Sequence, residues 1–294
     1  MNRIDLHIHS NCSDDGELSV HEILDASKNM GMKTISITDH NCVRGVSEAI
    51  GYGKQLGIEV VSGIEIDCTY NSVNLHLLGY FINQDMKEFD QLEQDIFDQE
   101  AKAFQQKIEN LREIGIVVDE GELLQKAAGR ITCGELIGEV VLNKAESIEN
   151  ELLKPYLKGG ERSNMPYLNF YRDFFAQGKA AYVPLRYLQL KDAIELVRKS
   201  NGIPVIAHPG ENLKDNMDMI DSIIKEGVMG IEVFSNYHTP GQIEYFYNKS
   251  KEHKLLVSCG SDFHGKNKPG IKIGECNCTI DEAYLVDSLK AACP

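Results

Sequence analysis

The sequence contains no run of about 18 consecutive apolar residues, the length that a membrane-spanning helix requires. Its first residues also lack the basic, apolar and small-residue sections of a signal peptide, because they pass directly into the strand-like pattern Arg3-Ile4-Asp5-Leu6. No internal repeat or low-complexity tract is present. From these absences we expect a cytoplasmic protein that does not associate with membranes.

The chain is also short of positive charge and of a disulfide framework. Its 30 Lys and Arg residues stand against 45 Asp and Glu residues, a formal net charge of −15. Such a surface repels phosphate backbones, which argues against long nucleic acids and requires metal ions or a local basic cluster for any phosphate substrate. The eight Cys residues are scattered, and Cys276-Asn277-Cys278 lacks zinc-knuckle spacing. Free thiols in a reducing compartment are the simplest interpretation.

What the chain does contain is an alternation of short apolar runs and helical patterns. Its apolar fraction of 42% is sufficient for a buried core. The apolar runs predict buried strands at 3–6, 34–37, 59–64, 203–207, 230–234 and 255–258. Helices are expected at 20–30, 47–56, 190–200, 213–226 and 241–252. Strands that alternate with helices favour a parallel sheet or a barrel, and residues 75–82 are expected to extend this core or form a hairpin with it.

The middle of the chain interrupts this alternation. From about Met86 to Gln177 the pattern is mostly helical and rich in charge, and the alternation resumes near Tyr182. Apolar residues recur there at helical spacing, among them Leu92, Ile96, Phe104, Ile108 and Leu111. We therefore expect a small helical subdomain at 101–180, inserted between a first part (1–100) and a second part (181–294) of the main domain.

Histidines and carboxylates gather where the predicted strands end. The residues concerned are His7, His9, Asp39, His40, Glu65, His208, Asp262 and His264. In barrels and open α/β sheets, active-site residues collect at the carboxyl ends of the strands. Five separate strand ends that each carry a His or a carboxylate are hard to obtain by chance.

The spacing of the first two histidines indicates a metal site. His7 and His9 lie two residues apart, so on a strand both side chains point to the same face and can reach one cation. A mixture of His and carboxylate ligands suits Zn, Mn or Fe. A carboxylate such as Glu65 can bridge two ions, which a single His cannot do.

These residues lie in segments that resemble the PHP (polymerase and histidinol phosphatase) family. The matching segments are DLHIHSNCSDDG (5–16), ITDHN (37–41), GIEID (63–67), HLLGY (76–80), AHPG (207–210), GIEVF (230–234) and GSDFHG (260–265). As a set they are highly specific, whereas AHPG or HxH alone is a weak indication. The closest similarity is to stand-alone PHP phosphoesterases that act on nucleotides and RNA ends. It implies an α/β protein with a distorted (β/α)7 barrel, the PHP fold, and an inserted small helical subdomain.

The same resemblance implies three divalent ions, with manganese preferred and zinc or iron as alternatives. One ion would be bound by His7, His9, Glu65 and Asp262, a second by Asp14, His40 and His264, and a third by Glu65, His76 and His208. The family's common Ser-Asp-Gly reads Ser13-Asp14-Asp15-Gly16 here. We place the ligand at Asp14, with Asp15 as the alternative.

Substrate contacts are also implied by the resemblance. Arg130 and Lys179 match a Gly-Arg motif of the insertion and a Lys shortly before Tyr-Val-Pro, and both are implied to contact phosphate. Arg130 is followed by Ile-Thr-Cys instead of the usual Pro-His, which departs from the pattern. His238 is a candidate for substrate binding and for protonating the leaving group. Asp39 is the second candidate for that proton, and the choice between them stays open.

The implied activity is hydrolysis of phosphate monoesters of small nucleotides, a nucleoside 5′-monophosphate or 3′,5′-bisphosphate, by attack of a metal-bridging hydroxide on phosphorus. Glu65 is central to this catalytic hypothesis. Alternatives are a histidinol-phosphate phosphatase, which the helical insertion argues against, and a 5′→3′ exonuclease on short RNA or DNA. Two further alternatives are a non-catalytic PHP module that binds a partner and a metal-dependent amidohydrolase. The intact ligand set argues against the first and the GSDFHG segment against the second; no oligomeric state is indicated.

Overall fold

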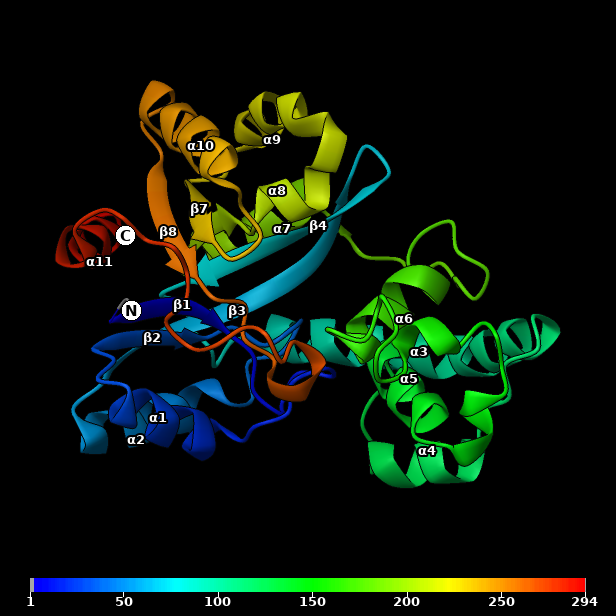
Figure 1. Ribbon diagram of the computed structural model, residues 1–294. Coiled ribbons are helices and arrows are strands. Elements are labelled where there is room, and N and C mark those ends of the chain that lie inside the picture. The colour runs from blue at the N-terminus through cyan, green and yellow to red at the C-terminus, as the bar shows by residue number, and fades with distance from the viewer. Residues whose placement is uncertain (1–2, 294) are drawn as a thin grey trace. The chain divides into compact units, whose positions relative to one another are not determined.

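The structure is a computed structural model that describes residues 3–293 of the chain, without the side chain of Glu146. These residues divide into two compact units. The first comprises residues 3–93, 187–263 and 271–293, and the second comprises residues 94–186 and 264–270. Figure 1 labels the helices and strands of both units, which are described one at a time below.

Seven strands of the first unit form a nearly closed barrel. They are β1 (Ile4–Ile8), β2 (Thr34–Ile37), β3 (Glu59–Tyr70), β4 (Val73–Tyr80), β6 (Ile203–Ile206), β7 (Gly230–Ser235) and β8 (Leu256–Gly260), hydrogen-bonded in this order. The short strand β5 (Leu188–Gln189) pairs with β3 outside this order. The backbone after β8 closes the barrel, since Asp262 N donates to His7 O at 2.8 Å and His9 N donates to Phe263 O at 3.0 Å. The expected α/β barrel is confirmed.

The strand β4 distorts the barrel, and its pairing with β3 makes β3 longer than predicted. β4 is antiparallel to both β3 and β6, whereas the other neighbours in the barrel are parallel. The strand predicted at 59–64 is β3, and its predicted end was wrong, because β3 continues to Tyr70. Pairing with β4 sustains it beyond the end of β2, through a hairpin whose Asn71 and Ser72 have φ angles of 48° and 64°. Glu65 therefore lies inside a strand and not at its end.

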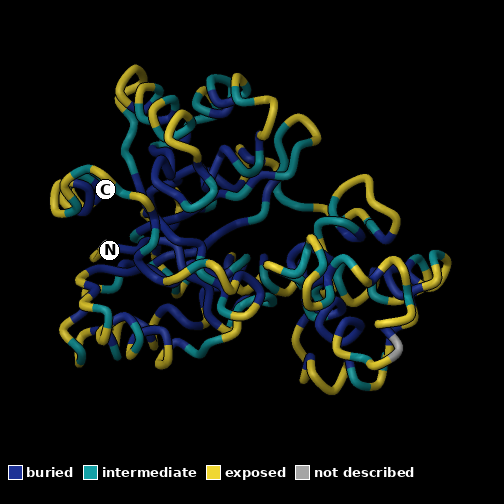
Figure 2. Tube along the Cα trace, in the orientation of Figure 1, coloured by how far each residue is buried: buried dark blue, intermediate teal, exposed yellow. Residues whose placement is uncertain are grey.

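Helices cover the outside of the barrel, and their ends follow local capping rules. They are α1 (Val20–Asn29), α2 (Val46–Leu56), α7 (Leu190–Lys199), α8 (Pro209–Leu213), η3 (Lys214–Met219), α9 (Ile220–Glu226), α10 (Pro240–Glu252) and α11 (Glu282–Ala291). α1 begins at a capping box formed by Ser19 and Glu22, and α10 begins at one formed by Thr239 and Gln242. Figure 2 shows buried strands inside and exposed outer faces on these helices. The amphipathic helices thus seal the core and leave the strand ends to carry polar side chains.

The second unit is built from helices. Its elements are most of α3 (Lys87–Glu113), then α4 (Glu120–Ala127), α5 (Gly134–Leu142), η1 (Ala145–Ile148), η2 (Lys154–Tyr156), α6 (Pro166–Phe174) and η4 (Gly265–Asn267). It has its own apolar core, in which Leu111, Val140 and Phe170 are almost fully buried. The helical insertion expected at 101–180 falls inside this unit.

Between residues 3 and 293, no helix combines the length and apolarity needed to cross a bilayer. All eight cysteines lie in this range, and each is a free thiol.

Candidate metal centre

Four side chains converge at the point where β1 and the backbone after β8 meet. They are His7, His9, Glu65 and Asp262, each buried. The Nε2 atoms of His7 and His9 lie 3.1 Å apart, as expected for two residues on one face of a strand. Each of these nitrogens lies 3.2 Å from Glu65 Oε2 and 3.2–3.3 Å from Asp262 Oδ1. The structure thus brings together the complete set predicted for the first ion.

The second oxygen of Glu65 faces a different pair of histidines. Glu65 Oε1 lies 3.1 Å from His76 Nδ1 and 3.1 Å from His208 Nε2. His76 projects from β4, and His208 lies two residues after the end of β6. Because the two oxygens of one carboxylate serve two separate groups of imidazoles, the geometry of Glu65 suits a ligand that bridges two cations. This second group is the set predicted for the third ion.

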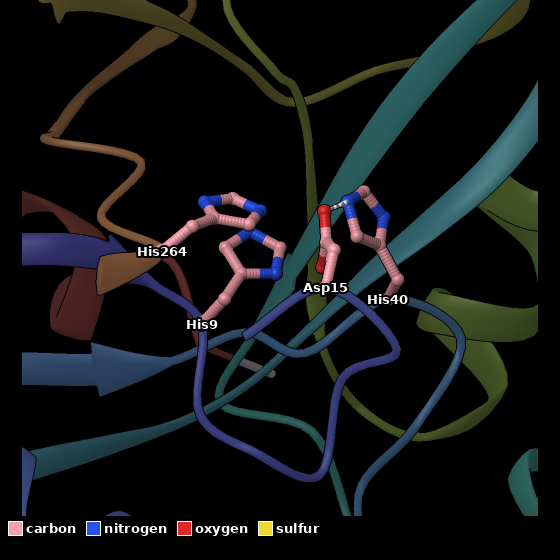
Figure 3. A group of neighbouring side chains, drawn as sticks. All are labelled: His9, Asp15, His40 and His264. Atoms are coloured by element: carbon pink, nitrogen blue, oxygen red, sulfur yellow. Dashed lines mark ion pairs between the residues drawn. The ribbon is translucent and has the colours of Figure 1, made fainter. Parts of the chain in front are cut away.

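A third group contains His9, Asp15, His40 and His264, and it favours one of the two open assignments. The donor atoms of these four side chains lie within 4.8 Å of one another. Figure 3 shows Asp15 turned toward His40, with His264 beside His9. The Asp15 Oδ2 atom lies 3.9 Å from His40 Nε2. Asp14 belongs to none of the groups found among the described residues, so the geometry favours Asp15, the alternative, over Asp14.

The two neighbouring carboxylates allow a matched test. We expect Asp15→Asn to weaken Mn²⁺ binding and to lower activity by about 10- to 100-fold, because it removes an anionic group next to His40. Asp14→Asn removes the same charge one residue away and is expected to change both quantities by less than about twofold. Equilibrium dialysis against Mn²⁺ compares the variants, and the opposite order of effects would return the assignment to Asp14.

Burial and neighbouring charges shift the pKa values of the histidines and carboxylates in this centre. Burial alone lowers the pKa of His7, but the carboxylates of Glu65, Glu232 and Asp262 outweigh it and place this pKa well above its usual value. Burial alone raises the pKa of Glu65, but the facing imidazoles hold it well below its usual value. The buried carboxylates therefore demand compensating positive charge, which protonated imidazoles or bound cations supply.

The donors present fit divalent cations. Imidazole nitrogens and carboxylate oxygens are the ligands of Zn, Mn and Fe sites, and here several converge from separate strands. The buried Glu65 Oε2 has no hydrogen-bond partner among residues 3–293, although two imidazole nitrogens lie 3.2 Å away. A cation at this point would satisfy an oxygen that the protein leaves unsatisfied.

Two carboxylates that the sequence analysis did not assign also belong to the centre. Asp67 Oδ1 lies 3.1 Å from His40 Nδ1 and 3.5 Å from His76 Nε2. Glu232 Oε1 lies 2.9 Å from His7 Nδ1. The i, i+2 spacing of Asp67 from Glu65 on one strand was the available indication for the first. The central position of Glu232 in the GIEVF segment was the available indication for the second.

The two candidates for proton transfer are engaged by other groups. Asp39 accepts hydrogen bonds from Ser10 N at 2.6 Å and from Ser10 Oγ at 2.7 Å, and burial raises its pKa to about 6. His238 Nδ1 donates to Val233 O at 2.8 Å, and its Nε2 accepts from Gly210 N at 2.9 Å. Both ring nitrogens are thus used by backbone, and burial lowers the His238 pKa. The catalytic and binding roles of His238 and Asp39 stay predictions, and this geometry does not support them.

Arg130 and Lys179 lie in the helical unit, where both side chains are exposed. Arg130 Nε donates to Ala127 O at 3.3 Å, next to the C-terminus of α4. The backbone N of Lys179 donates to Ala176 O at 3.0 Å in a turn after α6. Their role as phosphate contacts stays a prediction.

A known protein family matches this chain over more than half of its length. The PHP domain matches residues 5–181, which is more than half of the 294 residues. The chain belongs to the PHP family. It is accordingly a metal-dependent phosphoesterase, a hydrolase of phosphoric esters, and the family and enzyme class expected from the sequence are confirmed. The buried His, Glu and Asp groups are consistent with a multi-metal PHP site.

Individual relatives match this PHP chain over most of its length. It is 27% identical to a 3′,5′-nucleoside bisphosphate phosphatase from Chromobacterium violaceum, over 93% of this chain and 91% of the relative. It is 28% identical to a 5′-3′ exoribonuclease from Haemophilus influenzae, over 89% and 90%. A solved structure from Bifidobacterium adolescentis, described as a metal-dependent phosphoesterase, matches with a TM-score of 0.80 at 22% identity, covering 98% of this chain and 96% of the other. That likeness supports the barrel fold.

Proposed function

We propose that this phosphoesterase hydrolyses phosphate monoesters of small nucleotides, either a nucleoside 5′-monophosphate or a 3′,5′-bisphosphate. The observation that carries the proposal is the position of Glu65 between two buried groups of imidazoles, which suits adjacent cations. Paired cations are the common arrangement for displacement at phosphorus. The similarity to a nucleoside bisphosphate phosphatase over most of both chains supports the nucleotide as substrate.

Three divalent ions are proposed, manganese first and zinc or iron as alternatives. The proposed ligands are His7, His9, Glu65 and Asp262 for one ion, Asp15, His40 and His264 for another, and Glu65, His76 and His208 for the third. When bound, such ions lower the pKa of water and neutralise the oxygens of a phosphate. Three divalent ions would bring roughly six positive charges against the five carboxylates Asp15, Glu65, Asp67, Glu232 and Asp262, which leaves the centre locally positive in an acidic protein.

Residues of the chain keep these ligands in place. The hydroxyl of Tyr237 donates to Asp262 Oδ2 at 2.6 Å, so the other oxygen, Oδ1, is the one directed at His7 and His9. The ring of Tyr237 also lies edge-on to the ring of His208, with centroids 5.6 Å apart. Asp39 ties Ser10 to the end of β2 and thereby fixes the loop that follows His9. These contacts hold the donor atoms in a preformed arrangement.

The overall charge favours small substrates over long ones. At a net charge of −15, each additional phosphate of a long nucleic acid meets repulsion outside the centre. A mononucleotide places its phosphate at the centre and exposes little further negative charge to the surface. The second candidate, a 5′→3′ exonuclease on short RNA, is supported by the similarity to the Haemophilus influenzae exoribonuclease.

A substrate panel separates these functions. Protein loaded with Mn²⁺ is incubated with adenosine 5′-monophosphate, adenosine 3′,5′-bisphosphate, histidinol phosphate and a short 5′-phosphorylated RNA. We expect phosphate release to be fastest from one of the two nucleotides, with Glu65→Gln as the background control. Faster release of mononucleotides from the RNA would favour the exonuclease, and no reaction with either nucleotide would overturn the proposal.

A further inference from the structure

A buried carboxylate outside the proposed ligand sets links two of them. Glu232 lies in the middle of β7 and is fully buried. Its Oε1 lies 2.9 Å from His7 Nδ1, and its Oε2 accepts a hydrogen bond from the backbone N of His208 at 2.8 Å. A buried carboxylate is stable only when its oxygens are satisfied, and here each oxygen has one partner. The two partners belong to the two groups that share Glu65.

The contact with His7 fixes which ring nitrogen faces the centre. His7 Nε2 points to Glu65 and Asp262, while Nδ1 points away from them to Glu232. An ionised carboxylate accepts hydrogen bonds and donates none, so the proton of a neutral His7 resides on Nδ1. That tautomer leaves the lone pair of Nε2 directed at the centre. Carboxylates that orient histidine ligands in this way tune metal sites in proteins.

The contact with His208 restrains an unusual backbone conformation. His208 has a φ angle of 20° and a ψ angle of 59°, which a side chain with a Cβ adopts only under constraint. Its amide donates to Glu232, and its Nε2 lies 3.1 Å from Glu65 Oε1. Glu232 therefore holds the turn that brings the His208 ring to the second group.

Packing leaves Glu232 little freedom to move. A Cβ at Gly260, which lies on the neighbouring strand β8, would stand 2.1 Å from His7 Cβ and 2.7 Å from Glu232 Oε1. Only a glycine leaves space for the His7 and Glu232 side chains to meet at this position. The distance of 2.9 Å between Nδ1 and Oε1 is that of a direct hydrogen bond.

We infer that Glu232 is a positioning residue for the metal centre, which sets the tautomer of His7 and the backbone of His208 at the same time. The inference rests on the proposed function, since it presumes that cations bind at these ligands. The competing interpretation is that Glu232 is itself a ligand, because His7, His208 and Glu232 also form a possible cation group. If Glu232 were a ligand, its cation would replace the hydrogen bond between Glu232 Oε1 and His7 Nδ1. That cation would be bound by the His7 nitrogen that faces away from Glu65.

Two substitutions distinguish these roles. In Glu232→Gln the amide has one acceptor and one donor end, and the His208 amide is a fixed donor that requires the acceptor. The NH₂ group then faces His7 Nδ1, which can accept only if the His7 proton moves to Nε2. The wrong tautomer would point a proton at the cation. In Glu232→Ala a water can take the space, and His7 keeps its choice of tautomer.

The experiment is a Mn²⁺ titration of metal-stripped wild type, Glu232→Gln and Glu232→Ala, followed by the electron paramagnetic resonance signal of free Mn²⁺. We expect Glu232→Gln to bind Mn²⁺ about 10- to 100-fold more weakly than wild type, and more weakly than Glu232→Ala. The number of ions bound at saturation should stay unchanged in both. In protein loaded with diamagnetic Zn²⁺, nitrogen-15 shifts of the histidine rings should show His7 protonated at Nδ1 in the wild type and at Nε2 in Glu232→Gln.

Three results would overturn the inference. Equal binding by all three proteins would show that Glu232 does not influence the centre. Weaker binding by Glu232→Ala than by Glu232→Gln, with His7 still protonated at Nδ1 in the latter, would show a packing role only. Loss of one bound ion at saturation in both variants would identify Glu232 as a ligand. The titration needs no substrate, so failure of the nucleotide proposal appears in the substrate panel and failure of this inference in the binding data.

Discussion

Glu65→Gln is expected to lower phosphate release by roughly 10³-fold, equivalent to about 4 kcal/mol of transition-state stabilisation. The two oxygens of Glu65 face two different groups of imidazoles, so one substitution perturbs both. A glutamine has the same shape, but it lacks the charge and offers one oxygen in place of two. We therefore expect metal analysis to show the loss of more than one ion from the variant, with unchanged far-ultraviolet circular dichroism.

His76→Gln is the matched control for this substitution. His76 faces Glu65 Oε1 and Asp67 but takes no part in the group formed by His7, His9, Glu65 and Asp262. Its replacement is expected to cost about 10- to 100-fold in activity and to affect one ion. Full metal content and full turnover in Glu65→Gln would show that the bridging assignment is wrong. Equal losses in the two variants would show that Glu65 serves a single ion.

Much of this arrangement could be predicted because it follows from local periodicity. The positions of His7 and His9 on one face follow from the two-residue repeat of a strand, and their Nε2 atoms do meet at 3.1 Å. The apolar runs identified the strands closely, since parallel strands buried on both faces are nearly continuous in hydrophobicity. Ligands carried by six strands, or by the segments that follow them, then converge because the strand order of the barrel fixes which strands are neighbours.

The remaining features depend on contacts between distant segments. The extension of β3 to Tyr70 requires β4 as its partner, and no periodicity within β3 reveals it. The choice between Asp14 and Asp15 depends on how a loop turns toward His40. The engagement of both His238 nitrogens depends on the backbone of Gly210 and Val233. In each case the deciding contact joins segments that are separate in the sequence, so no pattern within one segment predicts it.

Removal of divalent ions is expected to abolish phosphate release, and added Mn²⁺ is expected to restore it. The metal-bound protein should also unfold at a higher temperature than the stripped protein. A ligand at 100 times its dissociation constant stabilises the folded state by about 2.7 kcal/mol per site, which corresponds to roughly 4 °C per site for a chain of this size. Dialysis against a chelator, metal analysis and differential scanning calorimetry measure these effects. Full activity in protein with no measurable metal would contradict the metal-dependent mechanism.

The stripped protein should nevertheless remain folded, which makes loss of activity interpretable. Without cations, the buried carboxylates still face imidazoles, as Glu65 faces His7 and Glu232 faces His7 from the other side. Carboxylates shift the pKa of His7 and of His40 upward, so that protons replace metal as the compensating charge. Glu65→Gln removes one of these carboxylates and, with it, the bridging ligand. Added Mn²⁺ should therefore raise its unfolding temperature by less than half of the wild-type increment, whereas Asp14→Asn should keep the full increment.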